Sequence, residues 1–181
     1  MKKILIRILI STFFGIILGV ITECALIFNW KTISLITQTI GFWVIVVLLG
    51  TLFSKDYKSA ILTNILLLDF MSLSYYFVRF IYSGHINWYS IQWYIVQGTI
   101  GAIIISIMLK LPKKGKYISV FFYLCLIFYF IYYYIINRTL QGSWTADRNI
   151  NYNIYIFIAI IGIVLCTFSI FKSLKNIKHG E

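Results

Sequence analysis

The sequence predicts an all-α fold, a polytopic membrane helical bundle of six transmembrane helices in a single domain over residues 1–181. Three observations support this prediction. First, 61% of the residues are hydrophobic and only 12% are charged, whereas a soluble domain has about half apolar and roughly a quarter charged residues. Second, apolar runs of about 20 residues, enough to cross ~30 Å of hydrocarbon, recur along the chain. Third, Lys and Arg gather in the short segments between these runs.

Each apolar run is assigned to one span. The first follows a basic start and imitates a signal peptide. Its apolar part is too long for one and lacks a small-x-small cleavage site, so we expect a retained helix. The longest polar segment, NRTLQGSWTADRNIN, separates the last two spans. The expected spans are 4–28, 33–53, 58–82, 89–109, 117–136 and 152–171.

The basic residues predict the orientation of the spans. Twelve of the sixteen lie at the two ends of the chain or in the segments after the second and fourth spans, and four lie on the opposite side. Because basic residues accumulate on the cytoplasmic side, both termini are expected in the cytoplasm, with the protein in the cell membrane. The formal charge of +11 thus reflects topology and contact with the lipid bilayer. A contiguous basic face with interleaved aromatics is absent, so no nucleic-acid partner is expected.

Motifs for catalysis and metal binding are missing from the sequence. Cys24, Cys125 and Cys166 are widely spaced within apolar runs, and both histidines, His85 and His179, lie outside the expected spans. No zinc-protease, phosphate-loop, dinucleotide or serine-hydrolase motif occurs. We therefore expect no enzyme activity, no cofactor and no metal.

One face of the third span is polar. Asp69, Ser72, Tyr76 and Arg79 follow one another at helical offsets that share a face. A charge within the membrane is costly, by roughly 2.5–3.5 kcal/mol on insertion scales, so it usually faces the interior of the bundle. This stripe predicts either a ligand site or a structural network that locks helices together.

The first span carries a stripe of small residues. Ser11, Gly15 and Gly19 recur every four residues and are followed by Glu23. Small residues let another helix approach closely, so they predict helix packing, with a partner inside or outside the chain. Glu23 and Arg79 lie at similar depths, which suggests that they pair.

Polar side chains of the spans collect in their outer halves, where Trp93 and Gln97 share one face of the fourth span. The inner halves read as nearly pure Ile, Leu, Val and Phe. This asymmetry predicts a pocket open to the outside, with aromatic walls and a few polar anchors. The alternative is that polar residues merely collect near an interface. The candidate ligand-binding residues are Glu23, Asp69, Tyr76, Arg79, Trp93 and Gln97.

Two family resemblances follow. GIILGVITE in the first span, NW before the second, FWVIVVLLG within it and SYYF in the third resemble an uncharacterised family of small multi-pass bacterial integral membrane proteins. Six spans, cytoplasmic termini and the small-xxx-small first span are similar to S components of energy-coupling-factor transporters. This resemblance implies that the first helix contacts a membrane coupling subunit and that a ligand binds in the outer half. Ser11, Gly15 and Gly19 stand where that family usually has alanine.

Two functions therefore remain open. In the first, the protein binds a small-molecule solute in an outward-facing pocket as part of a transport system, with other membrane subunits contacted through the first helix. In the second, it is a non-catalytic interaction protein, of an immunity or accessory type, whose polar residues are structural.

Overall fold

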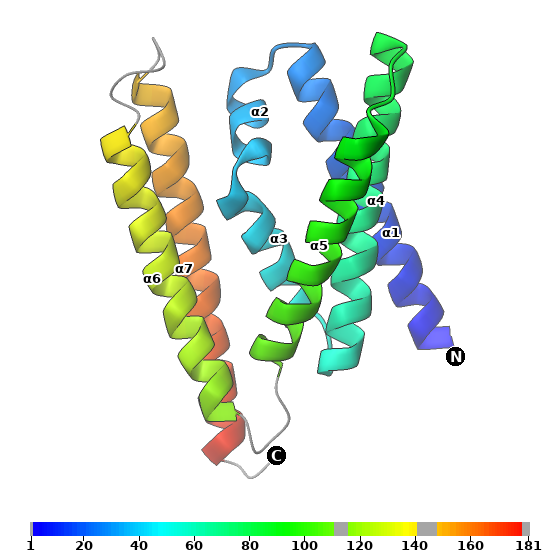
Figure 1. The fold of residues 1–181 in the computed structure, drawn as a ribbon. Coiled ribbons are helices and arrows are strands. Elements are labelled where there is room, and N and C mark those ends of the chain that lie inside the picture. Colours follow the sequence, from blue (N-terminus) through cyan, green and yellow to red (C-terminus); the bar gives the residue numbers. More distant parts are fainter. Residues whose placement is uncertain (1, 111–115, 141–147, 179–181) are drawn as a thin grey trace.

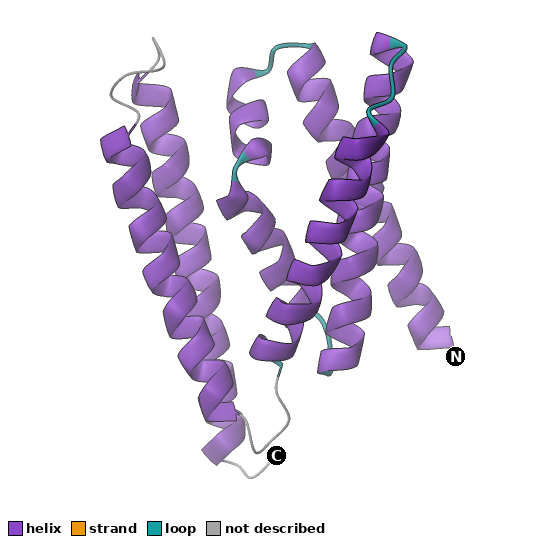
Figure 2. Ribbon diagram, in the orientation of Figure 1, coloured by secondary structure: helices purple, strands orange, loops and turns teal. Residues whose placement is uncertain are grey.

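The computed structural model describes residues 2–110, 116–140 and 148–178, and these form an all-α bundle of seven helices without strands (Figures 1 and 2). α1 begins and α7 ends at the same end of the bundle (Figure 1). The helices are α1 (Lys2–Ile27), α2 (Lys31–Gln38), α3 (Ile40–Leu52), α4 (Tyr57–Ser83), α5 (Trp88–Leu109), α6 (Lys116–Leu140) and α7 (Arg148–Lys178).

Several helices have the length and composition of membrane spans. Within the described residues, four are long and apolar enough: Ile4–Ile27, Tyr57–Ser83, Trp88–Leu109 and Asn153–Leu174. A bent pair, Lys31–Thr37 with Gly41–Leu52, would make a fifth. Large apolar side chains such as Phe13, 62% exposed, and Phe77, 63% exposed, lie on the outer surface. Such a surface suits lipid, in agreement with the multi-pass membrane prediction.

The span expected over 33–53 is not one continuous helix, because the chain breaks at Thr39 and bends by 63° between α2 and α3. Thr39 is extended (φ −80°, ψ 140°), and its side chain accepts a hydrogen bond from the Phe42 N–H at 3.2 Å. The Trp43 indole Nε1 donates to the Thr37 carbonyl at 3.0 Å. A break within an apolar segment frees backbone groups that need partners, and these two side chains supply them.

α1 and α4 pack against each other through the small-residue stripe. Ser11, Gly15 and Gly19 are all buried. A Cβ added at Gly15 would lie 2.5 Å from the Leu67 carbonyl oxygen, and one at Gly19 would collide with the carbonyl oxygen of Met71. Glycine is therefore required for this close approach, and the partner of the stripe is α4 of the same chain.

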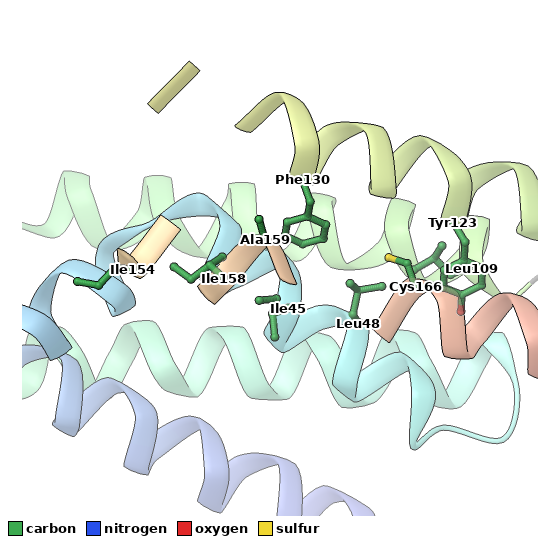
Figure 3. Close-up of a cluster of buried hydrophobic side chains, with 9 residues drawn as sticks. All are labelled: Ile45, Leu48, Leu109, Tyr123, Phe130, Ile154, Ile158, Ala159 and Cys166. Carbon is green, nitrogen blue, oxygen red and sulfur yellow. The ribbon is translucent and has the colours of Figure 1, made fainter. Parts of the chain in front are cut away.

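α6 and α7 form a hairpin whose inner face meets α3 and α5 in an apolar cluster (Figure 3). Phe130 of α6 is fully buried, and its ring lies over Gly162 of α7, where an added Cβ would strike it. Cys166 is also buried there as a free thiol, in keeping with its apolar surroundings. The cluster comprises Ile45, Leu48, Leu109, Tyr123, Phe130, Ile154, Ile158, Ala159 and Cys166.

The half of the bundle in which α1 begins was expected to be nearly pure Ile, Leu, Val and Phe, but it also contains a buried polar contact. Asn64 of α4 is fully buried, and its Nδ2 donates to Thr51 Oγ1 at 2.9 Å and to Ser106 Oγ at 2.8 Å. One amide thus links α3, α4 and α5. A single hydroxyl or amide residue hardly changes the mean hydropathy of an apolar run. Hydropathy alone therefore does not reveal that Thr51, Asn64 and Ser106 are in contact.

Candidate functional site

The site is built around an ion pair between α1 and α4. Arg79 Nε donates to Glu23 Oε1 at 2.9 Å. The Glu23 side chain is 4% exposed, whereas that of Arg79 is 44% exposed. Because Gly15 and Gly19 let α1 approach α4 closely, Glu23, one turn after Gly19, can reach Arg79 of α4. The Glu23–Arg79 pairing suggested by their similar depth is therefore present.

The pair fixes the guanidinium in one orientation. Arg79 Cζ lies 5.1 Å from the centroid of the Tyr75 ring, which gives a cation–π contact on one side. Among the described residues, the Nε bond to Glu23 is the one hydrogen bond that the Arg79 side chain makes. The two terminal nitrogens consequently keep their donors available.

A cavity of ≈ 850 Å³ lies between α1, α2, α3, α4 and α5. Its apolar lining includes Val47, Leu68, Met71 and Ile105. Its polar and aromatic lining includes Ser72, Tyr75, Tyr76, Arg79, Tyr94 and Gln97. Cavities of roughly 300–1,000 Å³ with mostly apolar walls and few polar groups are typical of small-molecule sites.

Three small residues of α5 leave this space empty. Gly98, Gly101 and Ala102 all line the cavity. A Cβ added at Gly101 would have no atom within 4 Å, and one at Gly98 would lie 3.6 Å from Leu68 Cβ, an ordinary contact. These glycines do not serve helix packing in the described part of the chain, in contrast to Gly15 and Gly19.

The broken segment forms another wall of the cavity. Thr37 from the end of α2 and Trp43 from the start of α3 both line it. The hydrogen bond between the Trp43 indole and the Thr37 carbonyl therefore lies at the cavity wall. Non-helical backbone at membrane depth is tolerated where it is buried in protein or lines a cavity, and this segment satisfies that condition.

The structure separates the predicted site residues into two groups. Tyr76, Arg79 and Gln97 line the cavity, whereas Glu23, Asp69 and Trp93 are not among its lining residues. Glu23 contacts Arg79 from α1, and Trp93 is 52% exposed. The six residues therefore do not share one pocket wall.

Asp69 is held at the α4–α5 contact instead of the cavity. Its Oδ1 accepts a hydrogen bond from Thr99 Oγ1 at 3.2 Å, and its side chain is partly buried. The lining face of α4 includes Leu68, Met71 and Tyr75, so Asp69 falls at the margin of that face. Its hydrogen bond to a neighbouring helix explains how an acid is accommodated in this span.

Sequence reasoning missed three aromatic lining residues, Trp43, Tyr75 and Tyr94. Tyr75 is one residue from the predicted stripe, and Trp43 follows a polar TQT triplet that interrupts an apolar run. That triplet was the available signal for the break and for the wall it forms. Tyr94 lies near Tyr76, with ring centroids 6.1 Å apart, but its position had no distinctive sequence pattern.

The site lacks the features of a metal centre, since no cluster of three potential metal-ligating residues occurs within the described ranges. No protein-family model, curated protein or solved structure matches the chain. The interpretation of the cavity therefore depends on its own geometry and chemistry.

Proposed function

We propose that the protein is an integral protein of the cell membrane with six spans and both termini in the cytoplasm. Two observations support this topology. The start of α1 and the end of α7 lie at the same end of the bundle (Figure 1). Twelve of the sixteen basic residues lie near the two ends of the chain or in the segments after the second and fourth spans, which this topology puts on one side of the membrane. The bent α2–α3 pair serves as the second span and α6 as the fifth. In this orientation Arg79 lies toward the outer side.

Its proposed role is to bind a small solute in the cavity, as part of a transport system. The observation that carries this proposal is the ≈ 850 Å³ cavity, lined at one place by the Arg79 guanidinium and elsewhere by aromatic and aliphatic side chains. A purely structural bundle gains nothing from unfilled space, because empty volume forfeits dispersion contacts. Gly98 and Gly101 keep that volume open.

The competing proposal is an interaction protein of an immunity or accessory type. The observation favouring it is that the Glu23–Arg79 and Asn64–Thr51–Ser106 contacts each join different helices. In that case the polar side chains serve assembly alone. A partner subunit would not use the Ser11–Gly15–Gly19 stripe of α1, since α4 covers it. It would meet the opposite face, where Leu9 and Phe13 are exposed.

The two proposals are separated by filling the cavity. Gly101→Leu adds a side chain at a position that lines the cavity and where a Cβ meets no atom within 4 Å. Val96→Leu enlarges an apolar side chain on the same helix at a position that is 53% exposed, and is the matched control. The wild type and both variants are purified from membranes, and small molecules that co-purify are quantified by mass spectrometry.

Solute binding predicts one small molecule that is retained by the wild type and by Val96→Leu but is depleted in Gly101→Leu, with all three equally folded. Equal recovery of every small molecule from the three proteins contradicts solute binding in this cavity. A partner protein that co-purifies equally with all three would then favour the interaction role.

A further inference from the structure

The cavity contains one charged lining residue in the described part of the chain, and it is the cation Arg79. Glu23, which balances it, is not among the lining residues and is almost fully buried behind the guanidinium. A solute entering the cavity therefore meets the positive partner of the pair first. An anion gains from this arrangement, whereas a cation finds no carboxylate on the described wall.

Arg79 is oriented for recognition of a planar anion. Glu23 occupies Nε, and the Tyr75 ring lies against the guanidinium. The remaining terminal nitrogens present parallel N–H donors, which match the two oxygens of a carboxylate in a bidentate contact. Glu23 thus acts as a positioning residue, because it holds the guanidinium without touching the solute.

The hydroxyl groups nearby differ in what they can still offer. Thr22 and Thr37 already donate, to the Leu18 carbonyl at 2.7 Å and the Ile33 carbonyl at 3.0 Å. Ser72 lines the cavity about two helical turns before Arg79 on α4, and makes no hydrogen bond with a described residue. Its O–H is available to a solute oxygen on the same face of the helix.

The rest of the wall favours an apolar body. Val47, Leu68, Met71 and Ile105 line the cavity, and Trp43 and Tyr94 add aromatic surface. A fully hydrophilic solute would lose hydration against this wall without recovering it. The volume of the cavity fits a molecule of drug-like size.

We infer that the solute is an amphipathic organic carboxylate whose head binds the free edge of Arg79 and whose apolar or aromatic body lies along Trp43, Leu68 and Ile105. This inference rests on the proposed solute-binding function and specifies its substrate class.

Three probes of one shape and different charge test it: 1-naphthylacetate, 1-naphthylacetamide and 2-(1-naphthyl)ethylamine. Their binding to the full chain in phosphatidylcholine nanodiscs is measured by equilibrium dialysis, and binding to empty nanodiscs is subtracted. We expect naphthylacetate to bind at least about tenfold more tightly than the neutral and cationic probes, because only it forms the bidentate contact.

Variants of the pair give the decisive readout. Arg79→Gln should abolish the preference for the anion, while Arg7→Gln, the same substitution at a basic residue near the start of α1, should leave it unchanged. Glu23→Gln keeps an oxygen to accept from Nε but removes the competing negative charge. It should raise the affinity for naphthylacetate severalfold, which a merely structural role of Glu23 would not do.

The outcomes distinguish this inference from the proposed function. If the three probes bind equally and Gly101→Leu abolishes their binding, the cavity binds solutes but charge does not select them, and the inference fails alone. If binding persists in Gly101→Leu, the cavity is not the site and both proposals fail. If none of the probes binds the wild type, or Arg79→Gln keeps the anion preference, the carboxylate assignment is overturned.

Discussion

The Nε of Arg79 lies 2.9 Å from Oε1 of Glu23, which joins α4 to α1 across 56 positions of sequence. The two residues differ in their surroundings, since the carboxylate is almost fully buried and the guanidinium borders the cavity. The second carboxylate oxygen, Oε2, is buried without a hydrogen-bond partner among the described residues. Arg79 is therefore the group that compensates the charge of Glu23.

Removing Arg79 should destabilise the protein more than removing Glu23. Glu23→Ala leaves a partly exposed guanidinium that can turn to solvent, whereas Arg79→Ala leaves a buried carboxylate without its partner. We expect Arg79→Ala to lower the free energy of unfolding by about 2–4 kcal/mol and Glu23→Ala by less. The double variant should cost less than the sum of the two, by roughly 0.5–3 kcal/mol of coupling. Unfolding in mixed detergent micelles measures all four proteins, and additive losses would show that the pair is energetically irrelevant.

Gly19 and Gly101 should respond in opposite ways to the same small change. Gly19→Ala forces a methyl group against the Met71 carbonyl and the Ser74 hydroxyl, so α1 and α4 must separate. The expected loss is about 1–3 kcal/mol. Gly101→Ala meets no atom within 4 Å and reduces the freedom of the unfolded chain, so it should be neutral or stabilising by up to ~1 kcal/mol. Thermal unfolding of both variants in one detergent checks the contrast, and equal effects would refute the assigned packing.

Asn64 should be the most sensitive polar residue in the half of the bundle in which α1 begins. Asn64→Ala removes both the contact to Thr51 and that to Ser106, and leaves the buried hydroxyls without this donor. A loss of about 1–3 kcal/mol is expected. Ser106→Ala removes one of the two bonds and should cost less, near ~1 kcal/mol. The same unfolding measurement ranks the variants, and a greater loss for Ser106→Ala would contradict Asn64 as the centre of the network.

Lys110, directly after α5, should make the stability of the protein depend on pH. Burial lowers the pKa of Lys110 below its usual 10.5, the positive charge of Lys172 lowers it further, and Asp56 partly opposes them. Because the folded state disfavours the charged form, the unfolded state binds more protons between the lowered pKa and 10.5. Stability should therefore rise with pH through that window. Lys110→Gln should abolish this increment while leaving the other groups in place, and a pH profile identical to that of the wild type would contradict it.

The sequence was informative about the helices and less so about their contacts. The runs expected at 4–28, 58–82, 89–109 and 152–171 correspond closely to the four helices with span character. The run at 33–53 did not reveal the bend at Thr39, because mean hydropathy is insensitive to one extended residue that is capped by its neighbours. The expected inner apolar halves likewise concealed Asn64, whose partners lie 13 and 42 positions away.

Contacts of the site could be predicted from the sequence only where the charge of a residue left few possible partners. Glu23 and Arg79 are charges of opposite sign at similar depth, so their pairing followed from the cost of an isolated charge. Asp69 is equally costly within the membrane, but its partner is the hydroxyl of Thr99. Several other hydroxyl groups could have donated that hydrogen bond, so the sequence did not identify the partner. Trp93 satisfied the spacing rule for one face with Gln97, yet only Gln97 lines the cavity. The lining face of α5 also includes Tyr94 and Gly98, and Trp93 lies beyond its edge.

By itself, the sequence determined that this chain forms apolar helices of membrane length. It also determined which charged side chains need a hydrogen-bond or ion-pair partner. The reason is local, since in hydrocarbon the backbone must bond within its own helix and charges must find partners. Only the tertiary structure decided that α4 covers the small-residue stripe, that Trp43 and Thr37 form a wall, and that Gly101 borders open space. Those outcomes depend on how helices rotate and approach one another, and that is set by the whole set of packing contacts.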